Sequence, residues 1–106
     1  MQNSDRKVFE KLSSILVEMA PDGWSNCKIE GSIFDDYGDI RCYSKLLGED
    51  YQKYFSGVDA SDRIYVLLDD LRSIMISAGQ PKWNRISFEL ARDGSFLTEF
   101  RCDEST

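Results

Sequence analysis

The chain has 106 residues and a net charge of −6, from nineteen acidic and thirteen basic side chains, and it contains no histidine. Its length suffices for one hydrophobic core, and hydrophobic residues make up 42% of the chain, which excludes a disordered protein. The acidic balance argues against direct nucleic-acid binding, and no apolar run approaches the roughly 20 residues of a membrane span. We therefore expect one domain over residues 1–106. The N-terminus has no signal-peptide pattern, so we expect a cytoplasmic protein.

The first predicted element is an amphipathic helix from Ser4 to Ala20. Its apolar residues recur at steps of three and four, which places them on one face. Ser4 or Asn3 is suited to cap its start, and Pro21 with Gly23 is suited to end it. The apolar face consists of Val8, Phe9, Leu12, Ile15, Leu16 and Met19.

Two strands are predicted next, because apolar and polar residues alternate over residues 27–33 and again over residues 40–46. The segment "DDYGD" over residues 35–39 is rich in carboxylates and contains a glycine, as is typical of a hairpin loop. A short third strand is expected over residues 51–55.

A second amphipathic helix is predicted from Asp59 or Ser61 to Gly79. Ser61 is suited to cap it, and Gly79 followed by Pro81 is the expected stop. Its apolar face consists of Ile64, Leu67, Leu68, Leu71, Ile74, Met75 and Ala78. The charged residues Asp62, Asp69, Asp70 and Arg72 lie off this face, so we expect them in solvent.

The segment "ISFELARDGSFLTEF" predicts a hairpin whose two strands each present apolar residues on one face. A three-residue loop of Arg92, Asp93 and Gly94 keeps both apolar sets on the same side, whereas a two-residue loop separates them. This loop pairs Leu90 with Phe96 and places Gly94 where a left-handed residue is required.

The order of elements predicts an α+β domain, with one antiparallel sheet of four or five strands and both helices packed on one face. Each helix has a single apolar stripe that a sheet face can cover. We expect Trp83 to anchor the second helix against the hairpin and Trp24 to do the same at the end of the first helix.

An enzyme is not expected, because a chain without histidine lacks the commonest general base and metal ligand. Neither a metal-ligand spacing nor a nucleotide-binding glycine pattern is present, so we expect no metal and no cofactor. Cys27, Cys42 and Cys102 are expected to be buried and reduced. A redox role is conceivable only if two of them face each other across paired strands.

Acidic residues and tyrosines crowd the middle of the chain, a combination typical of protein interfaces. The same distribution also fits an ordinary charged surface, and the sequence leaves both interpretations open. An acidic surface attracts a basic partner and accelerates its capture. The candidate contact residues are Asp35, Asp36, Tyr37, Asp39, Tyr43, Glu49, Asp50 and Tyr51.

The chain resembles the YezG-like bacterial immunity proteins along most of its length. The resemblance rests on "APDGW" after the first helix, and on Trp83, "ISFEL", the Asp-Gly turn with its following "SF", and "EF" in the hairpin. Cys102 stands where an aromatic residue is expected. The resemblance implies an immunity protein for a secreted polymorphic or contact-dependent toxin. It would bind the toxin's C-terminal domain, frequently a basic nuclease, in the cytoplasm and occlude its surface.

A secretion chaperone of the type III effector kind is the alternative, since such chaperones are also small, acidic and built from helices around an antiparallel sheet. They usually carry a final helix after the last strands, for which this sequence shows no pattern after Arg101. They are also obligate dimers.

Overall fold

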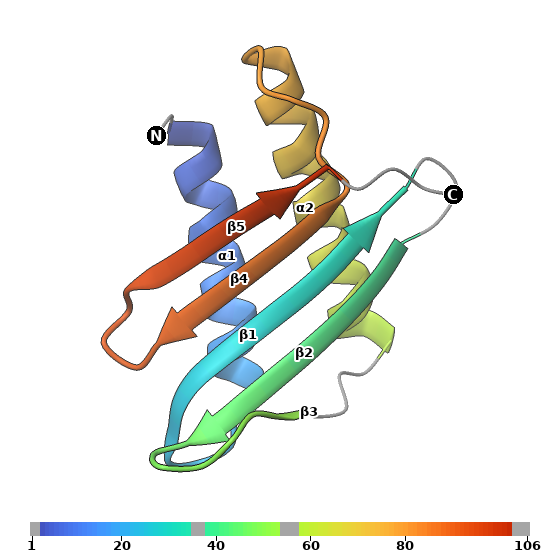
Figure 1. Cartoon of the computed structure of the whole chain (residues 1–106). Coiled ribbons are helices and arrows are strands. Elements are labelled where there is room, and N and C mark those ends of the chain that lie inside the picture. Colours follow the sequence, from blue (N-terminus) through green and yellow to red (C-terminus); the bar gives the residue numbers. More distant parts are fainter. Residues whose placement is uncertain (1–2, 35–37, 54–57, 103–106) are drawn as a thin grey trace.

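The computed structural model describes residues 3–34, 38–53 and 58–102. Its elements are α1 (Asn3–Met19), β1 (Trp24–Ile33), β2 (Gly38–Leu46), β3 (Gln52–Lys53), α2 (Val58–Ser77), β4 (Arg85–Ala91) and β5 (Phe96–Arg101). The strands form one antiparallel sheet in the order β3-β2-β1-β4-β5, and both helices lie on one face of it (Figure 1). The predicted α+β fold, with its order of elements, is confirmed.

Both helices form where the periodicity predicts them. α1 begins one residue before the predicted start, and the predicted caps are residues whose side chains lie outside the described part. α2 begins at Val58, so Ser61 lies inside the helix and is not its cap. Its end is as predicted: Gly79 adopts a φ of 86°, and the N–H of Gln80 donates to the Met75 carbonyl at 2.9 Å. Within the described residues, neither helix is long and apolar enough to cross a membrane.

The first hairpin differs from the prediction at its loop. Asp39 was expected in the loop but lies in β2, where it is paired with Ser32 of β1. β2 begins at Gly38, because the pairing between β1 and β2 extends as far as the pair of Ile33 and Gly38. The third strand is shorter than expected, with two residues, and residues 54–55 lie outside the described part.

The C-terminal hairpin has the predicted three-residue loop. The N–H of Ala91 donates to the Ser95 carbonyl at 2.8 Å, and Gly94 has a φ of 93°. Leu90 lies opposite Phe96, and the apolar sets of both strands share one face. The side chain of Asp93 accepts hydrogen bonds from the N–H and the hydroxyl of Ser95, which holds the turn closed.

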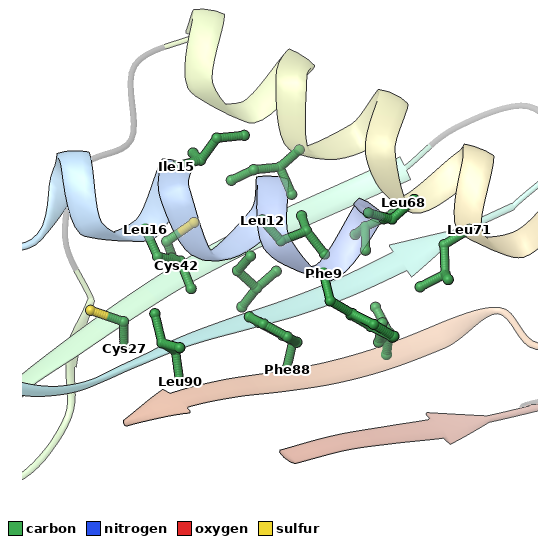
Figure 2. Packing of buried hydrophobic residues seen from close by; sticks show 14 of the residues in the cluster. Phe9, Leu12, Ile15, Leu16, Cys27, Cys42, Leu68, Leu71, Phe88 and Leu90 are labelled. Carbon is green, nitrogen blue, oxygen red and sulfur yellow. The ribbon is translucent and has the colours of Figure 1, made fainter. Parts of the chain in front are cut away.

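The hydrophobic core lies between the helices and the sheet. Figure 2 shows Leu12 and Leu16 of α1 and Leu68 of α2 pointing toward the side chains of the strands. Trp83 is 1% exposed, and the centre of its ring lies 5.1 Å from that of Phe100 on β5. Its role as an anchor for α2 stays a prediction. Trp24 is half-buried at the edge of the core, where the Arg92 guanidinium lies 4.9 Å from its ring.

Arg72 corrects one expectation about α2. Its side chain is half-buried, and its Nε donates to the backbone carbonyl of Trp83 at 2.8 Å. The guanidinium therefore ties α2 to the segment that precedes β4, while its helix neighbours Asp69 and Asp70 are exposed as expected. A hydrogen bond from a charged donor that is partly shielded from water is among the stronger ones in proteins.

The cysteines divide into two environments. Cys27 and Cys42 are buried thiols in the core, as expected, but Cys102 is exposed beyond β5. Cys27 lies opposite Ser44 and Cys42 lies opposite Ile29, so the two buried thiols are not direct cross-strand neighbours. The arrangement that a redox role would need is therefore not present for this pair.

Candidate partner-binding surface

One face of the sheet is left uncovered by the helices, and we call it the open face (Figure 1). Side chains in a strand alternate between faces, so the residues between the buried positions of each strand belong to it. They are Asn26, Lys28, Glu30 and Ser32 of β1, Asp39, Arg41, Tyr43 and Lys45 of β2, Arg85, Ser87, Glu89 and Ala91 of β4, and Leu97, Glu99 and Arg101 of β5.

The open face is a mosaic of both charges rather than an acidic surface. Lys28 lies 3.3 Å from Glu30, Arg41 lies 3.0 Å from Asp39, and Arg101 lies 3.8 Å from Glu99. The Arg41–Asp39 and Arg101–Glu99 pairs are exposed, so each contributes about 1 kcal/mol or less to stability, whereas the Lys28 side chain is half-buried. The excess of acidic residues in the sequence therefore lies elsewhere, in α2 and in the segments between the helices and strands.

Tyr51 folds back over the open face from the edge of the sheet. Its hydroxyl donates a hydrogen bond to the carboxylate of Glu89 on β4, two strands beyond β2. The Lys28 Nζ lies 4.5 Å from the centre of the Tyr51 ring and 5.2 Å from that of Tyr43, and the Lys45 Nζ lies 5.6 Å from the Tyr51 ring. We call these five residues the tyrosine cluster.

The tyrosine cluster holds its central hydroxyl as a hydrogen-bond donor. Burial raises the pKa of Tyr51, and the hydrogen bond to Glu89 and the negative charge of that carboxylate raise it further. The hydroxyl therefore stays protonated throughout the physiological range. The ammonium groups of Lys28 and Lys45 lie against the negatively charged faces of the tyrosine rings, which is a favourable contact. Several weak contacts therefore order the cluster together.

The structure brings four of the predicted contact residues together at one end of the open face. Tyr43 and Tyr51 belong to the tyrosine cluster, and Glu49 and Asp50 occupy the exposed turn directly before Tyr51. Asp39 lies six residues from Lys45 along β2, about 20 Å from that end, and is paired with Arg41. The predicted residues Asp35, Asp36 and Tyr37 lie outside the described part.

Sequence reasoning missed the basic half of this site. Lys28 lies opposite Tyr43 of β2 and opposite Glu89 of β4. The strand alternation puts all three side chains on one face, but placing them side by side also requires the register of these strands, which the sequence analysis did not predict. The reach of Tyr51 across two strands has no signal in the periodicity, because it depends on how the chain turns back after β2.

At the opposite end, the open face is hollowed. The hollow has a volume of about 380 Å³ and is lined mainly by polar side chains from four strands, among them Ser32, Arg41, Arg85, Ser87 and Arg101. The Arg85 guanidinium donates to the Ser32 hydroxyl at 3.2 Å. Carboxylates and guanidinium groups both line the hollow, so it offers hydrogen-bond acceptors and donors to a polar surface.

A scan against protein-family models found no family that matches the chain, and a search of the curated proteins found no match either.

Proposed function

We propose that this chain is an immunity protein that binds and neutralises the toxic domain of a cognate secreted toxin in the cytoplasm. The proposal combines the resemblance to the YezG-like proteins with one observation, the tyrosine cluster beside the acidic turn on an uncovered sheet face. Tyrosines that are already ordered lose little conformational freedom when a partner covers them.

The binding surface in this proposal is the tyrosine cluster together with the turn of Glu49 and Asp50. Tyr43 and Tyr51 provide the apolar area, and Leu47, which is 88% exposed in the same turn, adds to it. The two carboxylates of the turn meet lysines or arginines of a basic toxin domain, such as a nuclease. Covering the toxin's substrate groove, or a face beside it, then blocks its activity.

The first experiment is co-purification with the product of the gene immediately upstream, followed by titration at low and high salt. Binding that weakens with salt is expected, because attraction between an acidic and a basic surface is screened. Loss of the toxin's activity at stoichiometric amounts of the chain is the functional readout. A toxin that stays fully active in stoichiometric excess of the chain rules out the proposal.

Charge reversal separates the acidic turn from the general negative field of the protein. The variant Glu49→Lys with Asp50→Lys is expected to weaken binding by about tenfold or more at low salt. The control Asp69→Lys with Asp70→Lys makes the same change of charge on the exposed face of α2. If the two variants weaken binding equally, the turn is not the contact site.

A further inference from the structure

The strand β5 forms an outer edge of the sheet, and within the described residues no strand pairs with its outer side (Figure 1). The other outer strand, β3, has only two residues. β5 has six residues, with no proline, and its pairing with β4 is regular throughout. Such an edge is a template for pairing with another strand unless something blocks it.

The backbone groups that β5 offers can be assigned from its pairing with β4. The carbonyls of Ser95 and Arg101 accept hydrogen bonds from Ala91 and Asn84, so these odd-numbered residues direct their backbone groups toward β4. In an antiparallel ladder the direction alternates with each residue. Phe96, Thr98 and Phe100 therefore direct their N–H and carbonyl groups away from β4, toward the open edge.

The side chains of β5 are arranged symmetrically about Thr98. Phe96 and Phe100 lie two residues to either side of it on the helix-facing side, and both are only partly buried. The Thr98 hydroxyl is buried and has no hydrogen-bond partner among the described residues. On the open face, Leu97 is 73% exposed. A buried hydroxyl without a partner carries a cost that a second polar group can remove.

We propose that two copies of this chain associate through β5, antiparallel, about a two-fold axis at Thr98. In this register Thr98 lies opposite Thr98 of the second copy, Phe96 opposite Phe100, and Leu97 opposite Glu99. About six backbone hydrogen bonds form between the outward-facing groups. Cross-strand aromatic pairs and threonine pairs are both favourable in antiparallel sheets.

Charge disfavours the neighbouring register that pairs as much of β5 as the proposed one. Moving the second copy by two residues places Glu99 opposite Glu99 at the axis, and like charges directly opposite each other are unfavourable. Moving it by four residues allows Glu99 to face Arg101 but shortens the overlap and leaves Phe96 without an aromatic partner within the described residues. Within β5, the proposed register and the one centred on Glu99 each pair about five residues, and the register moved by four residues pairs about three.

The dimer is independent of the proposed toxin binding, because it uses the outer backbone edge of β5, whereas the toxin contacts the tyrosine cluster on the open face. Of that cluster, Glu89 lies beside β5, opposite Leu97. Pairing at the edge extends the sheet across both copies and leaves the open face uncovered in each. A failure of toxin binding therefore does not affect the expected dimer, and a monomeric protein can still bind a toxin.

Sedimentation equilibrium over a range of concentrations tests the dimer, whose expected mass is twice that of the 12.2 kDa chain. The variant Leu97→Glu places a carboxylate opposite Glu99 of the second copy in two symmetry-related pairs. It is expected to raise the dissociation constant on the order of tenfold. Leu97→Lys at the same exposed position is the matched control, and it is expected to preserve or tighten the dimer. Adding Glu99→Lys to Leu97→Glu restores opposite charges and is expected to rescue association.

Circular dichroism melts check that each variant is folded, since Glu89 lies opposite Leu97 within one chain. If Leu97→Glu does not fold, Thr98→Pro replaces it, because the Thr98 N–H faces outward and its loss removes no bond to β4. A wild-type protein that remains monomeric at its highest soluble concentration overturns the proposal. A dissociation constant that is unchanged in Leu97→Glu or Thr98→Pro, or that rises in Leu97→Lys, overturns it as well.

Discussion

Gly31 of β1 is a point where α2 closely approaches the sheet, and its substitution by alanine tests how tightly the two layers fit. A Cβ atom at Gly31 would lie 2.9 Å from Cδ1 of Leu68, 3.2 Å from Cγ2 of Ile86 and 3.4 Å from Cδ1 of Ile40. The first distance is well inside ordinary van der Waals contact. Leu68 is 0% exposed, so packed neighbours surround the methyl group that has to move.

The expected loss of stability follows from two opposing terms. Overpacking a well-filled core costs about 1–3 kcal/mol. Replacing glycine by alanine reduces the freedom of the unfolded chain and returns about 0.4–1 kcal/mol. Gly31→Ala should therefore lower the free energy of unfolding by roughly 1–2 kcal/mol, which is a fall in Tm of about 4 °C or more per kcal/mol for a domain of this size.

Urea denaturation followed by circular dichroism measures this change. The double variant Gly31→Ala with Leu68→Ala is the control, because the smaller side chain makes room for the added methyl group. Leu68→Ala alone should cost about 2–5 kcal/mol, and the double variant should cost less than the sum of the single ones. Wild-type stability in Gly31→Ala, or strict additivity in the double variant, would refute the close contact between α2 and β1.

Two further predictions concern the tyrosine cluster and the thiols. The folded state retains the Tyr51 proton above the ordinary pKa of 10.0, where the unfolded chain loses it, so the free energy of unfolding should fall as pH rises above about 10. Tyr51→Phe should lower the free energy of unfolding by about 1 kcal/mol at neutral pH, and its free energy of unfolding should fall less steeply above pH 10 than that of the wild type. If the free energies of the two proteins change with pH in parallel, the contact with Glu89 is contradicted. A thiol reagent should modify only Cys102 in the native protein and reach Cys27 and Cys42 after denaturation, and rapid native labelling of all three would contradict their burial.

The sequence alone determined the elements and the geometry of the last hairpin. The 3.6-residue and two-residue periods are local properties, and they placed both helices and the four main strands to within a few residues. The three-residue loop with Gly94 followed from a local requirement too, since only that loop keeps Phe96 and Leu90 on the same face. The layered α+β arrangement followed because each helix has one apolar stripe to cover.

The tertiary structure decided which polar residues meet. Arg72 looks like a solvent residue on the helical wheel, but the segment after α2 brings the Trp83 carbonyl within its reach. Tyr51 contacts Glu89 only because the chain folds back over β2 and β1. Such contacts depend on the paths of segments far apart in sequence, and short-range periodicity carries no information about them. The separation of Asp39 from the acidic turn has the same origin, since the stretch of β2 from Asp39 to Lys45 spans about 20 Å.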